Sequence, residues 1–208
     1  MLESAMIKAI TFDLDGVYFL NGKSNFIANL QTKYGVSEDE AKRVFLKSEQ
    51  MNVLYKTGKM SDEEFWTWAK NEWKISDDWQ KLPELMIEGY EVNEEVVPIV
   101  KAARGKGYKT VICSSNFPAR IEGLQKRFGF LNNFDAWALS YEVGHNKPDK
   151  ELFEELVRRS GLDASEITFA DDLQITVDAA KEVGISAFLY ENFDQFMGEL
   201  KKLGVEIE

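Results

Sequence analysis

The sequence predicts an α/β fold: a parallel sheet with helices on both faces, interrupted once by a helical insertion. Five short apolar runs recur along the 208 residues, and each of the last four follows a stretch with helical spacing. Break signals separate helix from strand, for example Gly107 and Gly184. Alternating strands and helices are typical of βαβ units, whose parallel sheets are buried on both faces.

The predicted strands are rich in β-branched and aromatic residues and are too short to be helices. A strand that is buried on both faces carries a near-continuous apolar run rather than a strict alternation of polar and apolar residues. The runs that meet this description are 9–12, 110–113, 136–139, 167–170 and 185–190.

The alternation stops over residues 18–92, where no strand is expected. Two capping boxes, beginning at Ser37 and Ser61, and further helical spacing predict a wholly helical segment. The helices expected there are 24–34, 38–50, 62–73 and 79–89. The chain length suits roughly one and a half domains. We therefore expect a core domain of residues 1–17 and 93–208, with 18–92 as a helical domain.

The composition excludes several classes of partner. Twenty-five basic and 36 acidic residues give a net charge of −11, which repels nucleic-acid polymers and anionic membrane surfaces. No apolar stretch approaches the ~20 residues of a membrane span, and the N-terminus lacks a signal-peptide pattern. The single cysteine, Cys113, fits a reduced, cytoplasmic setting. We expect a cytoplasmic monomer or small homo-oligomer, whose first residue is Met1 or Met6.

Two pairs of carboxylates follow predicted strands. Asp13 and Asp15 come directly after the first strand, and Asp171 and Asp172 come after the strand 167–170. Because the carboxyl ends of parallel strands lie at one edge of a sheet, both pairs are expected to converge. A hard divalent cation with oxygen ligands would relieve the repulsion among them. The sequence thus predicts a metal site at this edge.

A hydroxyl-rich turn and a lysine complete the candidate site. Ser114, Ser115 and Asn116 end one strand and open a helix, where hydroxyls and backbone N–H groups bind anions. Lys147 follows the strand 136–139, in a loop that Pro148 restricts. The candidate site therefore combines carboxylates, anion-binding donors and one lysine.

Taken in order, these motifs resemble those of the haloacid dehalogenase-like (HAD) hydrolase superfamily. The first is D-x-D-x-V, and the second is an apolar strand that ends in Ser-Asn. The third is K-P-D with a following Phe, and the fourth is an acidic pair before an alanine-containing helix. The matching segments are 13–17, 111–116, 147–153 and 169–172. The resemblance implies a Rossmann-like core, and the insertion is similar to the helical C1 cap of phosphatase-type members.

The resemblance further implies Mg²⁺-dependent hydrolysis of a small phosphomonoester, such as a sugar phosphate, a nucleotide or a similar metabolite. Asp13 would form an aspartyl phosphate, while Asp15 would protonate the leaving group and later activate water. The implied ligands of Mg²⁺ are the Asp13 carboxylate, the Asp15 backbone carbonyl and the Asp172 carboxylate, with Asp171 in support.

The resemblance also implies how the phosphoryl group is bound. Lys147, the Ser115 hydroxyl and the Asn116 N–H would face its oxygens, and Ser114 is the other candidate hydroxyl. Asp15 must be protonated for the first step, and burial beside Asp13 would favour that form.

Several alternatives stay open. A phosphomutase acting on a sugar phosphate would use the same aspartyl phosphate, and a HAD-fold binding protein would have lost turnover. Dehalogenation is disfavoured because the dehalogenases of the superfamily typically lack the second aspartate. The acidic, aromatic-rich insertion favours an uncharged or planar leaving group. Its lysines cannot be matched to the Schiff-base lysine of a phosphonatase; they include Lys23, Lys47, Lys56 and Lys59.

Overall fold

The computed structural model describes residues 6–207, so the proposed extension over residues 1–5 lies outside the described part of the chain. Five strands coincide with the predicted runs to within one residue at each end. They are β1 (Ala9–Phe12), β4 (Lys109–Ser114), β5 (Ala136–Leu139), β6 (Ile167–Asp171) and β7 (Ser186–Leu189). They form one parallel sheet in the order β5-β4-β1-β6-β7, which confirms the predicted α/β class.

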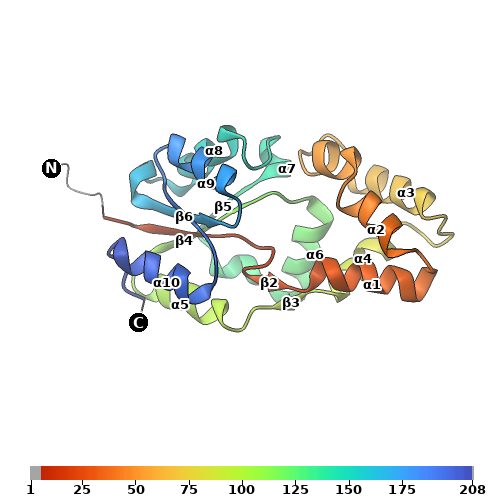
Figure 1. Cartoon of the computed structure of the whole chain (residues 1–208), viewed down its shortest axis with the longest axis horizontal. Helices are drawn as coiled ribbons and strands as arrows, with labels where there is room; N and C mark the ends of the chain where they lie inside the picture. The colour runs from red at the N-terminus through yellow and green to blue at the C-terminus, as the bar shows by residue number, and fades with distance from the viewer. Residues whose placement is uncertain (1–5, 208) are drawn as a thin grey trace.

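Alternate residues of each strand face opposite sides of the sheet, so both faces are apolar. Ile10 of β1 and Ile112 of β4 belong to one buried cluster, whereas Ala9 and Val111 belong to the other. Two helices cover each face (Figure 1): α5 (Val96–Gly105) and α10 (Phe193–Lys202) on the first, α8 (Lys150–Ser160) and α9 (Gln174–Glu182) on the second.

The remaining described helices of the core lie, in chain order, between β4 and β6. Two of them flank β5 along the chain, and α6 opens directly after the hydroxyl-rich turn that ends β4. They are α6 (Pro118–Phe128), α7 (Ser140–Val143) and the short 3₁₀ turns η2 (Phe130–Asn133) and η3 (Ala164–Glu166). Within residues 6–207, no helix is both long enough and apolar enough to cross a bilayer.

The insertion packs at one end of the core (Figure 1) and consists mainly of helices. The capping box at Ser61 is complete, while at Ser37 only the bond from the Glu40 N–H to the Ser37 hydroxyl is present. The helices are α1 (Gly22–Tyr34), α2 (Glu38–Phe45), α3 (Asp62–Glu72) and α4 (Lys81–Glu88), with a π-helical turn η1 (Gln50–Tyr55).

The end of α2 differs from the prediction. The helix expected over 38–50 stops at Phe45, and the chain continues as η1. Ser48 explains the break, because its hydroxyl donates to the Val44 carbonyl at 2.6 Å and accepts from the Met51 N–H at 3.1 Å. A serine side chain that bonds the backbone in this way competes with regular helical bonding.

The expectation that residues 18–92 contain no strand is wrong. β2 (Phe19–Leu20) and β3 (Glu91–Val92) pair antiparallel where the insertion leaves and rejoins the core. Strands of two residues leave no periodicity in a sequence, so pattern analysis could not detect them. The segment is therefore helical except for this ribbon at its base.

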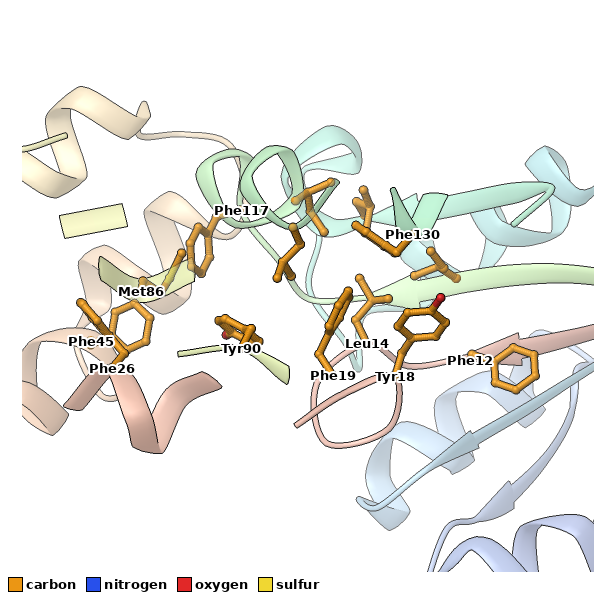
Figure 2. Packing of buried hydrophobic residues seen from close by; sticks show 14 of the residues in the cluster. Phe12, Leu14, Tyr18, Phe19, Phe26, Phe45, Met86, Tyr90, Phe117 and Phe130 are labelled. Carbon is orange, nitrogen blue, oxygen red and sulfur yellow. The ribbon is translucent and has the colours of Figure 1, made fainter. Parts of the chain in front are cut away.

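One apolar cluster runs without a break from the sheet into the insertion. Figure 2 shows it passing from Phe12 in β1, through Phe19 and Tyr90, to Phe26 and Phe45 in the cap helices. Phe19 and Tyr90 pack edge to face with ring centroids 6.2 Å apart. This shared packing holds the insertion beside the end of β1.

Candidate active site

The candidate site lies at the carboxyl end of β1, the central strand of the sheet. β4 flanks β1 on one side and β6 on the other, and all three strands run parallel. Asp13 follows β1, Ser114 ends β4 and Asp171 ends β6. Because parallel strands end at one edge, the sheet brings together residues that are far apart in the chain.

Lys147 bridges two of these carboxylates. Its Nζ donates to Asp13 Oδ2 at 3.0 Å and to Asp171 Oδ2 at 2.7 Å. Burial alone would lower the pKa of Lys147, but the charges of Asp13 and Asp171 raise it above its ordinary value. Lys147 therefore supplies a fixed positive charge directly beside Asp13.

The second acidic pair divides into a buried and an exposed carboxylate. Asp171 is 5% exposed, and its Oδ1 accepts from the Leu173 N–H at 3.0 Å while Oδ2 accepts from Lys147. Asp172 is exposed and lines the same pocket as Asp13. Asp171 thus holds Lys147, while the Asp172 carboxylate makes no such contact.

The two adjacent serines take different partners. Ser114 Oγ donates to Asp13 Oδ1 at 2.9 Å, whereas Ser115 Oγ accepts from the Lys147 N–H at 3.0 Å. Ser114, the alternative candidate, therefore contacts Asp13. Ser115, the hydroxyl expected to bind the phosphoryl group, instead holds the loop that carries Lys147. The role of Ser115 toward a phosphoryl group stays a prediction.

The role expected of the Asn116 N–H needs correction. This N–H donates to Ser140 Oγ at 2.8 Å, so it does not face the site. Asn116 is completely buried, and its side-chain amide lies 3.3 Å from Ser114 Oγ. Asn116 therefore holds the turn after β4 in place.

Asp15 is held by two cations that the sequence analysis did not assign. It forms an ion pair with Lys23 of α1, and Arg120 Nη2 of α6 lies 3.4 Å from its Oδ1. Burial alone would raise the pKa of Asp15, but the charges of Arg120 and Lys23 hold it below its ordinary value. The expectation that burial keeps Asp15 protonated is thus wrong for this arrangement. Arg120 follows the Ser-Asn motif within the first turn of a helix, which was its only signal in the sequence.

The carboxylates line a pocket of about 220 Å³ that could hold a metal ion. Asp13, Asp15 and Asp172 all line it, and carboxylate and carbonyl oxygens are the hard donors that Mg²⁺ prefers. Among residues 6–207, no three His, Cys, Asp or Glu side chains form a metal-binding cluster. The expected ligand set would not form such a cluster, because it contains only two carboxylates and its third donor is a backbone carbonyl. All three donors are hard oxygen atoms, so the chemistry of the set fits Mg²⁺.

The insertion is hydrogen-bonded to the loops that carry the site. Ser140 Oγ donates to the Lys56 carbonyl at 2.6 Å, and Asn146 Nδ2 donates to the Asn52 carbonyl at 2.7 Å. Gly58 approaches the core so closely that an added Cβ would lie 2.3 Å from the Tyr141 carbonyl oxygen. The η1 segment is thus docked beside the Lys147 loop.

Cys113 takes no part in this chemistry. It is fully buried in β4, and burial raises the pKa of its thiol to about 12. A thiol that stays protonated at neutral pH is a poor nucleophile.

Comparison with known proteins places the chain in a family. A sequence profile of the haloacid dehalogenase-like hydrolases matches residues 7–184. A Dictyostelium discoideum protein is 33% identical over 159 residues, 73% of this chain and 66% of that protein. A D-ribitol-5-phosphate phosphatase of Bacteroides thetaiotaomicron is 37% identical over 71 residues, 34% of each chain. A flavin mononucleotide hydrolase of Arabidopsis thaliana is 24% identical over 131 residues, 62% of this chain and 53% of that protein. The chain thus spans less than two thirds of the length of these relatives.

Solved structures share the fold. A HAD family enzyme of B. thetaiotaomicron, in complex with magnesium and inorganic phosphate, superposes with a TM-score of 0.75 at 19% identity, covering 91% of this chain and 98% of that one. A HAD phosphatase of Thermococcus onnurineus gives a TM-score of 0.65 at 23% identity, covering 97% and 100%.

Proposed function

This chain belongs to the haloacid dehalogenase-like hydrolases, and we propose that it hydrolyses a small phosphomonoester with Mg²⁺ as cofactor and Asp13 as nucleophile. The observation that carries the proposal is the position of Lys147 between Asp13 and Asp171 at the end of the central strand. Relatives named as a phosphatase and a mononucleotide hydrolase, and a structural neighbour bound to magnesium and phosphate, support it.

Three contacts orient the Asp13 carboxylate for attack. Oδ1 accepts from the Leu14 N–H at 2.8 Å and from Ser114, and Oδ2 accepts from Lys147. In the proposed first step an Asp13 oxygen forms a bond to phosphorus while the bond to the leaving oxygen breaks. Lys147 balances negative charge on the transferring group. Bound Mg²⁺, held by Asp13, Asp172 and the Asp15 carbonyl, would offset the repulsion between carboxylates and phosphate.

Asp15 would act as general acid in the first step and as general base in the second. It gives a proton to the departing alkoxide and, in the second step, takes one from the water that attacks the aspartyl phosphate. The charges of Arg120 and Lys23 hold the pKa of Asp15 below its ordinary value, which favours the ionised form that the second step needs. For the first step Asp15 must take up a proton from solvent before the alkoxide leaves. A cytoplasmic setting, the absence of a nucleic-acid partner and a monomeric or small oligomeric state stay predictions from the sequence.

The test is phosphate release from p-nitrophenyl phosphate and a panel of sugar, nucleotide and small-acid phosphates. We expect turnover with Mg²⁺ and none with EDTA. Phosphoryl transfer to a second sugar phosphate, with little free phosphate, would indicate the mutase instead. If folded protein that binds Mg²⁺ releases phosphate from none of these substrates, the proposal is contradicted.

A further inference from the structure

A second pocket, of about 240 Å³, lies between the insertion and the core. The insertion contributes Lys23, Lys56, Phe45 and Met51, and α6 with its preceding residue contributes Arg120 and Phe117. The proposed mechanism does not use this pocket, although it holds three cationic side chains.

Arg120 is the deepest of these cations. It is 2% exposed and lies over the Tyr90 ring, with its guanidinium carbon 5.1 Å from the ring centroid. Its Nε and Nη2 find no hydrogen-bond acceptor among residues 6–207, because Asp15 Oδ1 at 3.4 Å is not aligned to accept. Buried guanidinium groups normally have acceptors, since each unmet donor is costly. These two donors are therefore available to an acceptor from outside the chain, such as a bound anion.

The pocket also carries an excess of positive charge. Its lining residues include Lys23, Lys56 and Arg120 but no acidic residue, and the neighbouring Asp15 is already paired with Lys23. Lys56 shows the consequence: burial, followed by the charges of Lys23 and Arg120, lowers its pKa to about 8. An anion in the pocket would relieve this repulsion.

The pocket continues the path of the leaving group. Asp15 lines the catalytic pocket, and its carboxylate contacts Lys23 and Arg120 of the second pocket. A leaving group whose oxygen departs beside Asp15 would extend toward these cations. Resting on the proposed function, we infer that the substrate is a phosphomonoester whose leaving group carries its own anionic group, a carboxylate or a second phosphate, bound by Arg120, Lys56 and Lys23.

This inference reverses the preference for an uncharged leaving group that the composition suggested. The chain as a whole is acidic, with a net charge of −11, yet the cations converge where the insertion meets the core. Net charge describes the whole surface and does not predict the charge of one pocket.

The test compares matched substrates. Glycerate phosphorylated at its terminal hydroxyl is set against glycerol phosphorylated at the same position, and a propanediol bisphosphate against the monophosphate. We expect kcat/KM to favour an anionic member by about tenfold or more, because hydrogen bonds to charged groups are strong enough for that ratio. The pair with the larger ratio identifies carboxylate or phosphate as the anion.

Variants assign the preference to the pocket. Lys56→Met should reduce the ratio of kcat/KM for the anionic over the neutral substrate several-fold. Lys59→Met removes the same charge at an exposed position of the insertion and should leave this ratio unchanged. Arg120→Met should reduce it further, but this buried residue also supports packing, so Lys56→Met is the deciding variant. Equal kcat/KM for both members of each pair would overturn the inference and leave the hydrolase standing.

A binding measurement separates the two proposals. Calorimetric titration in EDTA should show that glycerate binds more tightly than glycerol, and that Lys56→Met weakens glycerate binding. If no phosphomonoester is hydrolysed but this pattern holds, the proposed function fails and the anion pocket stands. If glycerate and glycerol bind alike, a carboxylate is excluded as the anion; if the propanediol bisphosphate also shows no advantage over the monophosphate, the pocket inference is overturned.

Discussion

Arg120 and Asp15 face each other across the boundary of two pockets, with Arg120 Nη2 3.4 Å from Asp15 Oδ1. Asp15 belongs to the pocket that holds Asp13 and Asp172, and Arg120 to the cationic pocket beneath the insertion. The pair therefore connects the proposed site of phosphoryl transfer to the site that would bind the leaving group.

The cationic pocket predicts a pH dependence. The pKa of Lys56 is lowered to about 8, first by burial and then by Lys23 and Arg120, with Asp15 opposing them and Lys147 adding to them. Lys56 is charged below that pH and loses its proton as the pH rises through it. The ratio of kcat/KM for the anionic over the neutral substrate should therefore fall above about pH 8. Taking the ratio cancels ionisations that both substrates share. A ratio that stays flat between pH 7 and pH 9.5 would contradict the role of Lys56.

Lys147→Met should destabilise the fold as well as abolish activity. It leaves the Asp13 and Asp171 carboxylates without their shared cation, although the Asp13 side chain is only 19% exposed and that of Asp171 only 3%. Removing one partner of a buried pair costs about 3–5 kcal/mol, and the partial exposure of Asp13 places the loss at the lower end. Urea denaturation in EDTA measures the free energy of unfolding. Lys150→Met, at a lysine 63% exposed, is the control and should change it little.

The two serines predict different losses of activity. Ser115→Ala should lower kcat/KM by about a hundredfold, because it removes the hydroxyl proposed to bind the phosphoryl group and loosens the Lys147 loop. Ser114→Ala removes only one of the three contacts that orient Asp13 and should cost less. Steady-state kinetics on both variants decides the matter. A larger loss at Ser114 would reassign the phosphoryl-binding hydroxyl to that residue.

Gly58→Ala should undock the insertion from the Lys147 loop. Gly58 has φ +71°, and its added Cβ would meet the Tyr141 carbonyl oxygen at 2.3 Å. Gly35 has the same φ with nothing within 4 Å, so Gly35→Ala measures the backbone cost alone, about 1–2 kcal/mol. Thermal unfolding and kcat/KM should both fall more for Gly58→Ala. Equal effects of the two changes would show that docking through η1 is unimportant.

The sequence predicted those parts of the fold that have a period or a motif. All five core strands were recognisable because each is a buried apolar run, and α3 because Ser61 and Glu64 form a complete capping box. The β2–β3 ribbon and the break at Ser48 were missed, because both depend on hydrogen bonds that leave no repeat in the sequence.

For the site, strand ends predicted which carboxylates converge, since topology alone brings Asp13 and Asp171 to one edge. The orientation of individual groups was beyond reach: Ser114 and Asn116 took roles set by the exact course of the turn after β4. Arg120 and Lys56 were missed as a pair, because only the docked insertion brings them together.

Trapping the covalent intermediate tests the proposed nucleophile most directly. Wild-type enzyme is quenched in acid during turnover of p-nitrophenyl phosphate with Mg²⁺, digested, and analysed by mass spectrometry, with Asp13→Asn treated in parallel. The proposal predicts a phosphoryl group on the peptide that contains Asp13, and none in Asp13→Asn, which should remain folded and lose at least about a thousandfold in rate. Phosphate release by wild type without any phosphorylated Asp13 peptide, or undiminished release by Asp13→Asn, would contradict it.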